Sequence, residues 1–150
     1  MVYGVHVAFA ILFLVGIAAA AVFNVRALAA PRPSAVVREF RRVRPIAMIV
    51  SLALLGALAT GLVLVHRRGY AYGDGWILAS IVLWVLANAL GGIGGGRDRR
   101  TRELAERLAA EGDTPSDDLR RRVRDPVSLA LSYGAGLAGI AIFVLMLTKP

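Results

Sequence analysis

Two histidines are the side chains best suited to chemistry in this 150-residue sequence. His6 lies near the start of the first apolar stretch and His66 at the end of the second, so antiparallel helices would place both at the same end. Two neutral imidazoles from facing helices can hold haem b iron axially, and Arg67 and Arg68 could pair with its propionates. The competing interpretation is structural, with His66 at an interface and His6 hydrogen-bonded to a neighbouring helix.

The sequence lacks the residues that other kinds of functional site require. The sequence has no cysteine, which excludes disulfides, thiolate metal sites and cysteine nucleophiles. Two histidines are too few for tetrahedral zinc unless Asp74 and a water, or a second subunit, complete the shell. Met48 and Met146 are typical of packing rather than of copper ligation. No serine lies in a recognisable nucleophile turn. The sequence therefore does not establish enzymatic activity, and a non-catalytic role is favoured.

Four apolar stretches must position these side chains: residues 2–25, 46–65, 76–93 and 127–148, none of which contains Asp, Glu, Lys or Arg. Each is close to the roughly twenty residues that cross a hydrocarbon layer of about 30 Å. They are apolar all round, unlike the amphipathic helices of a soluble bundle. The sequence therefore predicts an all-α, four-transmembrane-helix bundle, a single domain over residues 1–150 without a separate soluble core.

The basic residues predict the orientation of this bundle. The net charge is +8, and six arginines lie in segment 26–45 and nine in segment 97–126, against Arg67, Arg68 and Lys149 elsewhere. The positive-inside rule places both segments in the cytoplasm and both termini outside. Anionic lipid headgroups, rather than nucleic acid, are the expected counter-charge. A sequence rich in Arg, Ala and Gly with a single Lys suggests a bacterial plasma membrane.

Each basic segment ends in an arginine-rich arm followed by a proline, Pro45 or Pro126, and each arm begins at a serine suited to cap a helix, Ser34 or Ser116. This repeat suggests a duplicated helical hairpin. The first arm is predicted to be an amphipathic helix at the level of the lipid headgroups, with a kink at Pro45. The glycine-rich run 91–96 is expected to be a flexible hinge rather than a phosphate-binding loop, since no strand precedes it.

Small residues on the second and fourth apolar stretches suggest how the protein functions. Gly56 and Gly61, and likewise Gly136 and Gly139, predict faces for close helix packing. The favoured function is a structural or accessory membrane protein that packs with itself, as a homo-oligomer, or with a larger membrane complex. The first alternative is a haem b-binding redox protein that uses His6 and His66. The second is a small-solute transporter, although the apolar stretches carry no charged side chains for an ion pathway.

Several short motifs resemble a known family. They are Val5-His6-Val7-Ala8, Gly16, Thr60-Gly61 and Gly75-Trp76. The sequence resembles the bacterial predicted integral membrane proteins of domain of unknown function 2269 over most of its length, which implies a topology and no activity. The histidine of the first stretch more distantly resembles that of HemJ-type protoporphyrinogen oxidases and copper-resistance D proteins. HemJ-type enzymes bind haem b and have a lysine in a later span, which is missing here, and copper-resistance D proteins are richer in His and Met.

Overall fold

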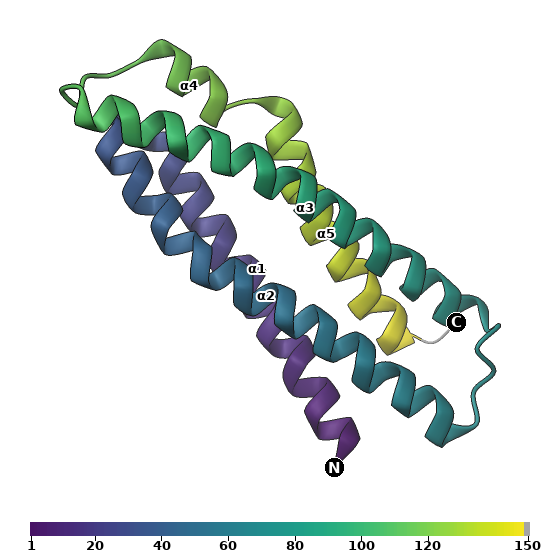
Figure 1. Cartoon of the computed structure of the whole chain (residues 1–150). Helices are drawn as coiled ribbons and strands as arrows, with labels where there is room; N and C mark the ends of the chain where they lie inside the picture. The colour runs from purple at the N-terminus through teal and green to yellow at the C-terminus, as the bar shows by residue number, and fades with distance from the viewer. Residues whose placement is uncertain (149–150) are drawn as a thin grey trace.

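A computed structural model describes residues 1–148, which form five α-helices (Figure 1), and Lys149 lies outside the described residues. The helices are α1 (Val2–Ala29), α2 (Pro33–Arg68), α3 (Gly75–Ala110), α4 (Asp117–Val123) and α5 (Pro126–Thr148). Four helical segments are long and apolar enough to cross a membrane: α1, α2, α3 and the segment that ends in α5. The predicted all-α, four-helix membrane bundle is confirmed.

The helices pack as two hairpins. α1 lies along α2 and α3 lies along α5, while α2 contacts α3 between the hairpins. Glycines allow the close approach, because a Cβ at Gly56 would lie 2.5 Å from the ring of Phe9, and one at Gly139 would collide with the ring of Phe13. At Gly56 and Gly139 the predicted small faces are therefore occupied by large side chains of the same chain. This arrangement agrees with a repeated helical hairpin.

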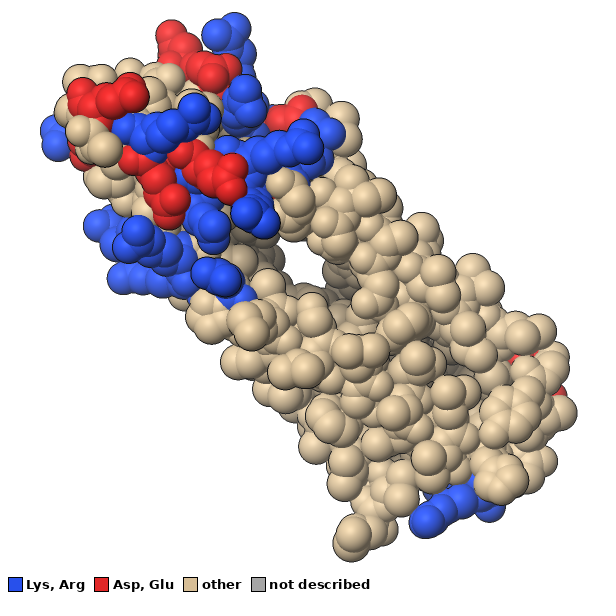
Figure 2. All heavy atoms as spheres, in the orientation of Figure 1, with Lys and Arg blue, Asp and Glu red and all other residues tan. Residues whose placement is uncertain are grey.

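The charged residues extend beyond the membrane. α2 has 36 residues, a length of about 54 Å, so about 24 Å projects from a hydrocarbon layer of about 30 Å. Figure 2 shows most basic and acidic side chains gathered at one end of the molecule, over α4 and the adjacent ends of α2 and α3. We call this end the arginine-rich head; it comprises residues 33–44, 97–110 and α4.

The arginine-rich head has a small hydrophobic core of its own. Val36, Val37, Ala105 and Leu119 are buried together, and Phe40 packs against them. The prediction that no separate core exists outside the membrane was wrong. The first arm and the second span form one helix, because α2 continues unbroken through Pro45. The apolar face of this arm, which was expected to meet lipid, is covered by α3 and α4.

The expected glycine hinge is helical. α3 continues without interruption from Gly75 to Ala110, through residues 91–96. Gly94 faces α5, where a Cβ would lie 3.5 Å from Leu131. Packing between α3 and α5 thus stabilises a segment whose composition alone favours flexibility.

Side chains at the helix ends hold the segments of the arginine-rich head together. Ser116 caps α4, since its hydroxyl oxygen accepts from the Leu119 N–H, as predicted. Ser34 does not cap α2, because the helix begins one residue earlier, at Pro33. Instead, the Ser34 N–H and hydroxyl donate to Asp113 at 2.7 and 2.6 Å. Asp113, in the turn after α3, therefore satisfies a donor at the start of α2.

Candidate functional site

A cavity of about 380 Å³ lies between the hairpins, at the end of the bundle opposite the arginine-rich head. α1, α2, α3 and α5 all contribute to its lining, which is mostly aliphatic and aromatic. The polar side chains that reach it include His6, Arg68 and Ser80. An apolar cavity of this size with a few converging polar groups is typical of a site for a small molecule.

His6 lies at the wall of the cavity, where α1, α2 and α5 meet. Its Nδ1 is 2.9 Å from the Thr60 Oγ1, and its Nε2 is 3.3 Å from the Met146 Sδ. Gly61 leaves room for the imidazole, since a Cβ there would be 3.3 Å from the His6 Cε1. The predicted hydrogen bond from His6 to a neighbouring helix is confirmed. Two of the short motifs, around His6 and at Thr60-Gly61, thus form one contact.

The last turn of α2 divides the other predicted site residues between two faces. Arg68 lines the cavity, with its guanidinium carbon 5.6 Å from the ring centroid of Tyr3. Val65, three residues earlier, is buried and also lines the cavity, whereas His66 and Arg67 do not line it; His66, Arg67 and Arg68 are all exposed. The structure thus brings His6 and Arg68 to one cavity and leaves His66 and Arg67 outside it.

Aromatic side chains of α3 and the preceding loop form the opposite wall. The rings of Tyr70 and Trp76 meet edge to face, with centroids 5.5 Å apart. The Trp84 indole N–H donates to the Leu54 carbonyl at 3.0 Å, which ties α3 to α2, and Ser80 donates to the Trp76 carbonyl. Hydrogen bonds within the wall therefore engage Ser80 and Trp84, and His6 and Arg68 are the groups best placed to meet a ligand.

The sequence did not indicate that Met146 and Trp84 belong to the wall of the large cavity. Met146 is separated from His6 by 140 positions, and its spacing in an apolar stretch is that of a packing residue. Thr60 enters the sequence analysis only through the Thr60-Gly61 motif. The one signal that could have found it is the pair Thr60-Gly61, whose neighbour in an antiparallel hairpin is the start of α1.

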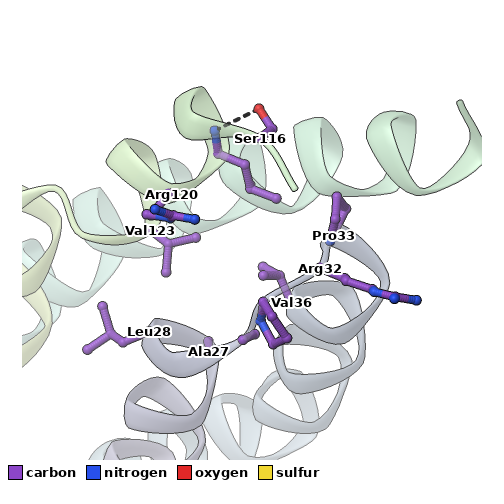
Figure 3. A pocket seen from close by; sticks show the side chains of 11 residues that line it. Ala27, Leu28, Arg32, Pro33, Val36, Ser116, Arg120 and Val123 are labelled. Atoms are coloured by element: carbon purple, nitrogen blue, oxygen red, sulfur yellow. Dashed lines mark hydrogen bonds between the residues drawn. The ribbon is translucent and has the colours of Figure 1, made fainter. Parts of the chain in front are cut away.

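A second cavity, between the end of α1, the start of α2 and α4, is too small to bind a ligand. Figure 3 shows Ala27, Leu28, Val36 and Val123 around it, with Arg120 at its edge. Its volume is about 20 Å³, enough for a single water molecule. We therefore regard the large cavity as the candidate functional site.

Comparisons with known proteins agree with the fold and supply no activity. Neither a curated protein nor a solved structure matches the chain. One family model matches, over residues 1–150, and its description is "Predicted integral membrane protein (DUF2269)". Because the match covers the whole sequence, the chain belongs to this family of integral membrane proteins, domain of unknown function 2269.

Proposed function

We propose that this protein binds a lipid-like anion, with the apolar chain in the large cavity and the anionic group at Arg68. The observation that carries the proposal is the cavity itself, about 380 Å³ of mainly apolar lining with a guanidinium at the end of α2. Inside a bilayer, the apolar chain of a lipid-like molecule packs against such a lining through van der Waals contacts. A guanidinium pairs with a carboxylate or phosphate through two parallel hydrogen bonds.

The proposed site lies on the outer side of a bacterial plasma membrane. The support is the charge distribution, because the arginine-rich head is expected in the cytoplasm and the cavity lies at the opposite end. Both termini would then be outside. Arg68 would lie near the level of the outer headgroups, where the charged end of a lipid-like molecule is found.

The geometry favours this function over haem b binding and over small-solute transport. Axial ligation by His6 and His66 needs both imidazoles at one site, and His66 is exposed away from the cavity. We expect purified protein to show no Soret band. A Soret band lost in His6→Ala and in His66→Ala would instead support the redox alternative. An apolar lining also suits a lipid-like ligand better than a small polar solute.

An open surface at Gly136 supports an accessory role in a larger membrane assembly. A Cβ at Gly136 meets no atom of the described chain within 4 Å, so this part of α5 is open to another helix. Gly56 is not, because Phe9 covers it. Gly136→Leu should therefore disperse an assembly without unfolding the monomer, as measured by crosslinking in membranes.

The experiment that tests lipid binding compares two neighbouring arginines. The purified protein, in nanodiscs, is titrated with a spin-labelled fatty acid, and bound lipids are also extracted and identified by mass spectrometry. Arg68→Gln should weaken binding about tenfold, equivalent to about 1.4 kcal/mol. Arg67→Gln makes the same charge change in the same turn, at a side chain that does not line the cavity, and should have little effect. Equal effects of the two substitutions, or no binding by the unmodified protein, would contradict the proposal.

A further inference from the structure

The hydrogen bonds around His6 determine which of its ring nitrogens carries the proton. The Thr60 hydroxyl lies 2.6 Å from the Gly56 carbonyl oxygen, a distance at which the hydroxyl proton must lie between the two oxygens. Thr60 has no second proton to donate, so its oxygen accepts from the His6 Nδ1 at 2.9 Å. In the neutral imidazole, Nδ1 then carries the hydrogen and Nε2 carries a lone pair.

The lone pair of Nε2 faces a sulfur atom that also has no hydrogen. The Met146 Sδ lies 3.3 Å from Nε2, and a thioether is a weak acceptor without a donor. The His6 Nε2 and the Met146 Sδ, each with a lone pair and no hydrogen, therefore face each other. A cation between them would convert this contact into an attraction, and thioether with imidazole is a donor set that suits Cu(I).

We propose that His6 and Met146 form a binding site for Cu(I) at the wall of the large cavity. An ion about 2.0 Å from the nitrogen and about 2.3 Å from the sulfur would form an N–Cu–S angle of about 100°, because the two donor atoms are 3.3 Å apart. This bent geometry leaves a position for a further ligand from the cavity. The proposal is independent of the lipid-like ligand, because it uses the His6–Met146 contact and not Arg68.

The surroundings of His6 have the features of a metal site. A histidine that binds a metal usually donates its other ring N–H to a fixed oxygen, which orients the ring. Thr60 provides that oxygen, and the Gly56 carbonyl in turn orients the Thr60 hydroxyl. The donors come from α1 and α5, and the orienting oxygen from α2, so the packing of three helices sets their positions. Zinc is disfavoured, since it prefers four ligands and thiolate over thioether.

The test is a titration of the full-length protein in detergent with Cu(I) alone, under anaerobic reducing conditions, in competition with a chromophoric Cu(I) chelator. We expect one Cu(I) per chain, and at least a tenfold loss of affinity in Met146→Leu, which conserves the side-chain volume. Met48→Leu is the matched control, because Met48 is 61% exposed on α2. Its affinity should equal that of the unmodified protein.

A third variant tests the orienting role of Thr60. Thr60→Val retains the shape of the side chain and removes the acceptor for Nδ1, and loss of such a contact typically lowers metal affinity about 10–100-fold. X-ray absorption of the loaded protein should show one sulfur neighbour, absent in Met146→Leu. Failure of the unmodified protein to compete for Cu(I), or equal affinity in Met146→Leu, would overturn the proposal. Arg68→Gln should keep the Cu(I) affinity of the unmodified protein, because Arg68 takes no part in the His6–Met146 contact, so failure of lipid binding leaves the Cu(I) proposal to be tested on its own.

Discussion

At the scale of single residues, the close packing of this bundle depends on pairs of a glycine and a large side chain. Phe9 lies over Gly56 and Phe13 over Gly139, so α1 approaches both α2 and α5 where these helices have no side chain. Sequence reasoning identified the glycines correctly and assigned them to contacts with other chains. It could not identify Phe9 and Phe13 as their partners, because the register between helices depends on the packing of whole surfaces.

The first prediction concerns Gly56. In Gly56→Ala the new methyl group would lie 2.5 Å from the Phe9 ring, and we expect a loss of about 1–3 kcal/mol in the free energy of unfolding from overpacking. Gly92→Ala is the control, since Gly92 is helical and a methyl group there would meet no atom of the described chain within 4 Å. That change should leave stability equal or slightly higher, because alanine favours helix. Unfolding in mixed micelles measures both, and equal stabilities would refute the packing assignment.

At the scale of helices, the largest differences from the sequence-based expectation lie in α2 and α3. Both continue through residues that usually end or bend a helix, Pro45 in α2 and the glycine-rich run 91–96 in α3. Composition predicted the four spans because hydrophobicity is a local property. Continuity of a helix also depends on contacts between distant residues. Near Pro45, Val36 and Val37 of α2 pack against Ala105 and Leu119, and in the glycine-rich run Gly94 of α3 packs against α5.

The second prediction concerns the contact that joins the α3–α4 turn to the start of α2. Hydrogen bonds from the Ser34 hydroxyl, and then from the Ser34 N–H, hold the pKa of the Asp113 carboxyl below its usual value of 3.8. A carboxyl whose pKa is lower in the folded state stabilises the fold above pH 3.8, and this contribution is lost as the pH falls through the lower, folded-state pKa.

The unfolding temperature should therefore fall on acidification below pH 3.8 by more in the unmodified protein than in Asp113→Asn, which lacks the titrating group. Asp113→Asn should also be less stable at neutral pH, because a neutral amide accepts hydrogen bonds more weakly than a carboxylate. Glu111→Gln, an exposed change just before the same turn, is the control and should keep the pH profile of the unmodified protein. Identical profiles for Asp113→Asn and the unmodified protein would contradict the assignment.

At the scale of the whole molecule, the two ends of the bundle have different characters. One end is the arginine-rich head, and the other holds the large cavity with His6, Arg68 and the aromatic wall. Sequence reasoning predicted this polarity from the positions of the arginines, and it placed His6 and Arg68 at the correct end. It could not separate Arg68 from Arg67, or His6 from His66, because the direction of a side chain at the end of a helix depends on which face its neighbours cover.

The last prediction tests which end faces the cytoplasm. The sequence has no cysteine, so a single introduced thiol is the only site for a membrane-impermeant maleimide. Gly73→Cys places it in the exposed loop before α3, beside the cavity, and Thr114→Cys places it in the exposed connection between α3 and α4, next to the arginine-rich head. Because basic segments are retained in the cytoplasm, Gly73→Cys should react in intact cells and Thr114→Cys only after permeabilisation. The reverse pattern would place the cavity on the cytoplasmic side, and the lipid-like ligand would then have to come from the inner leaflet.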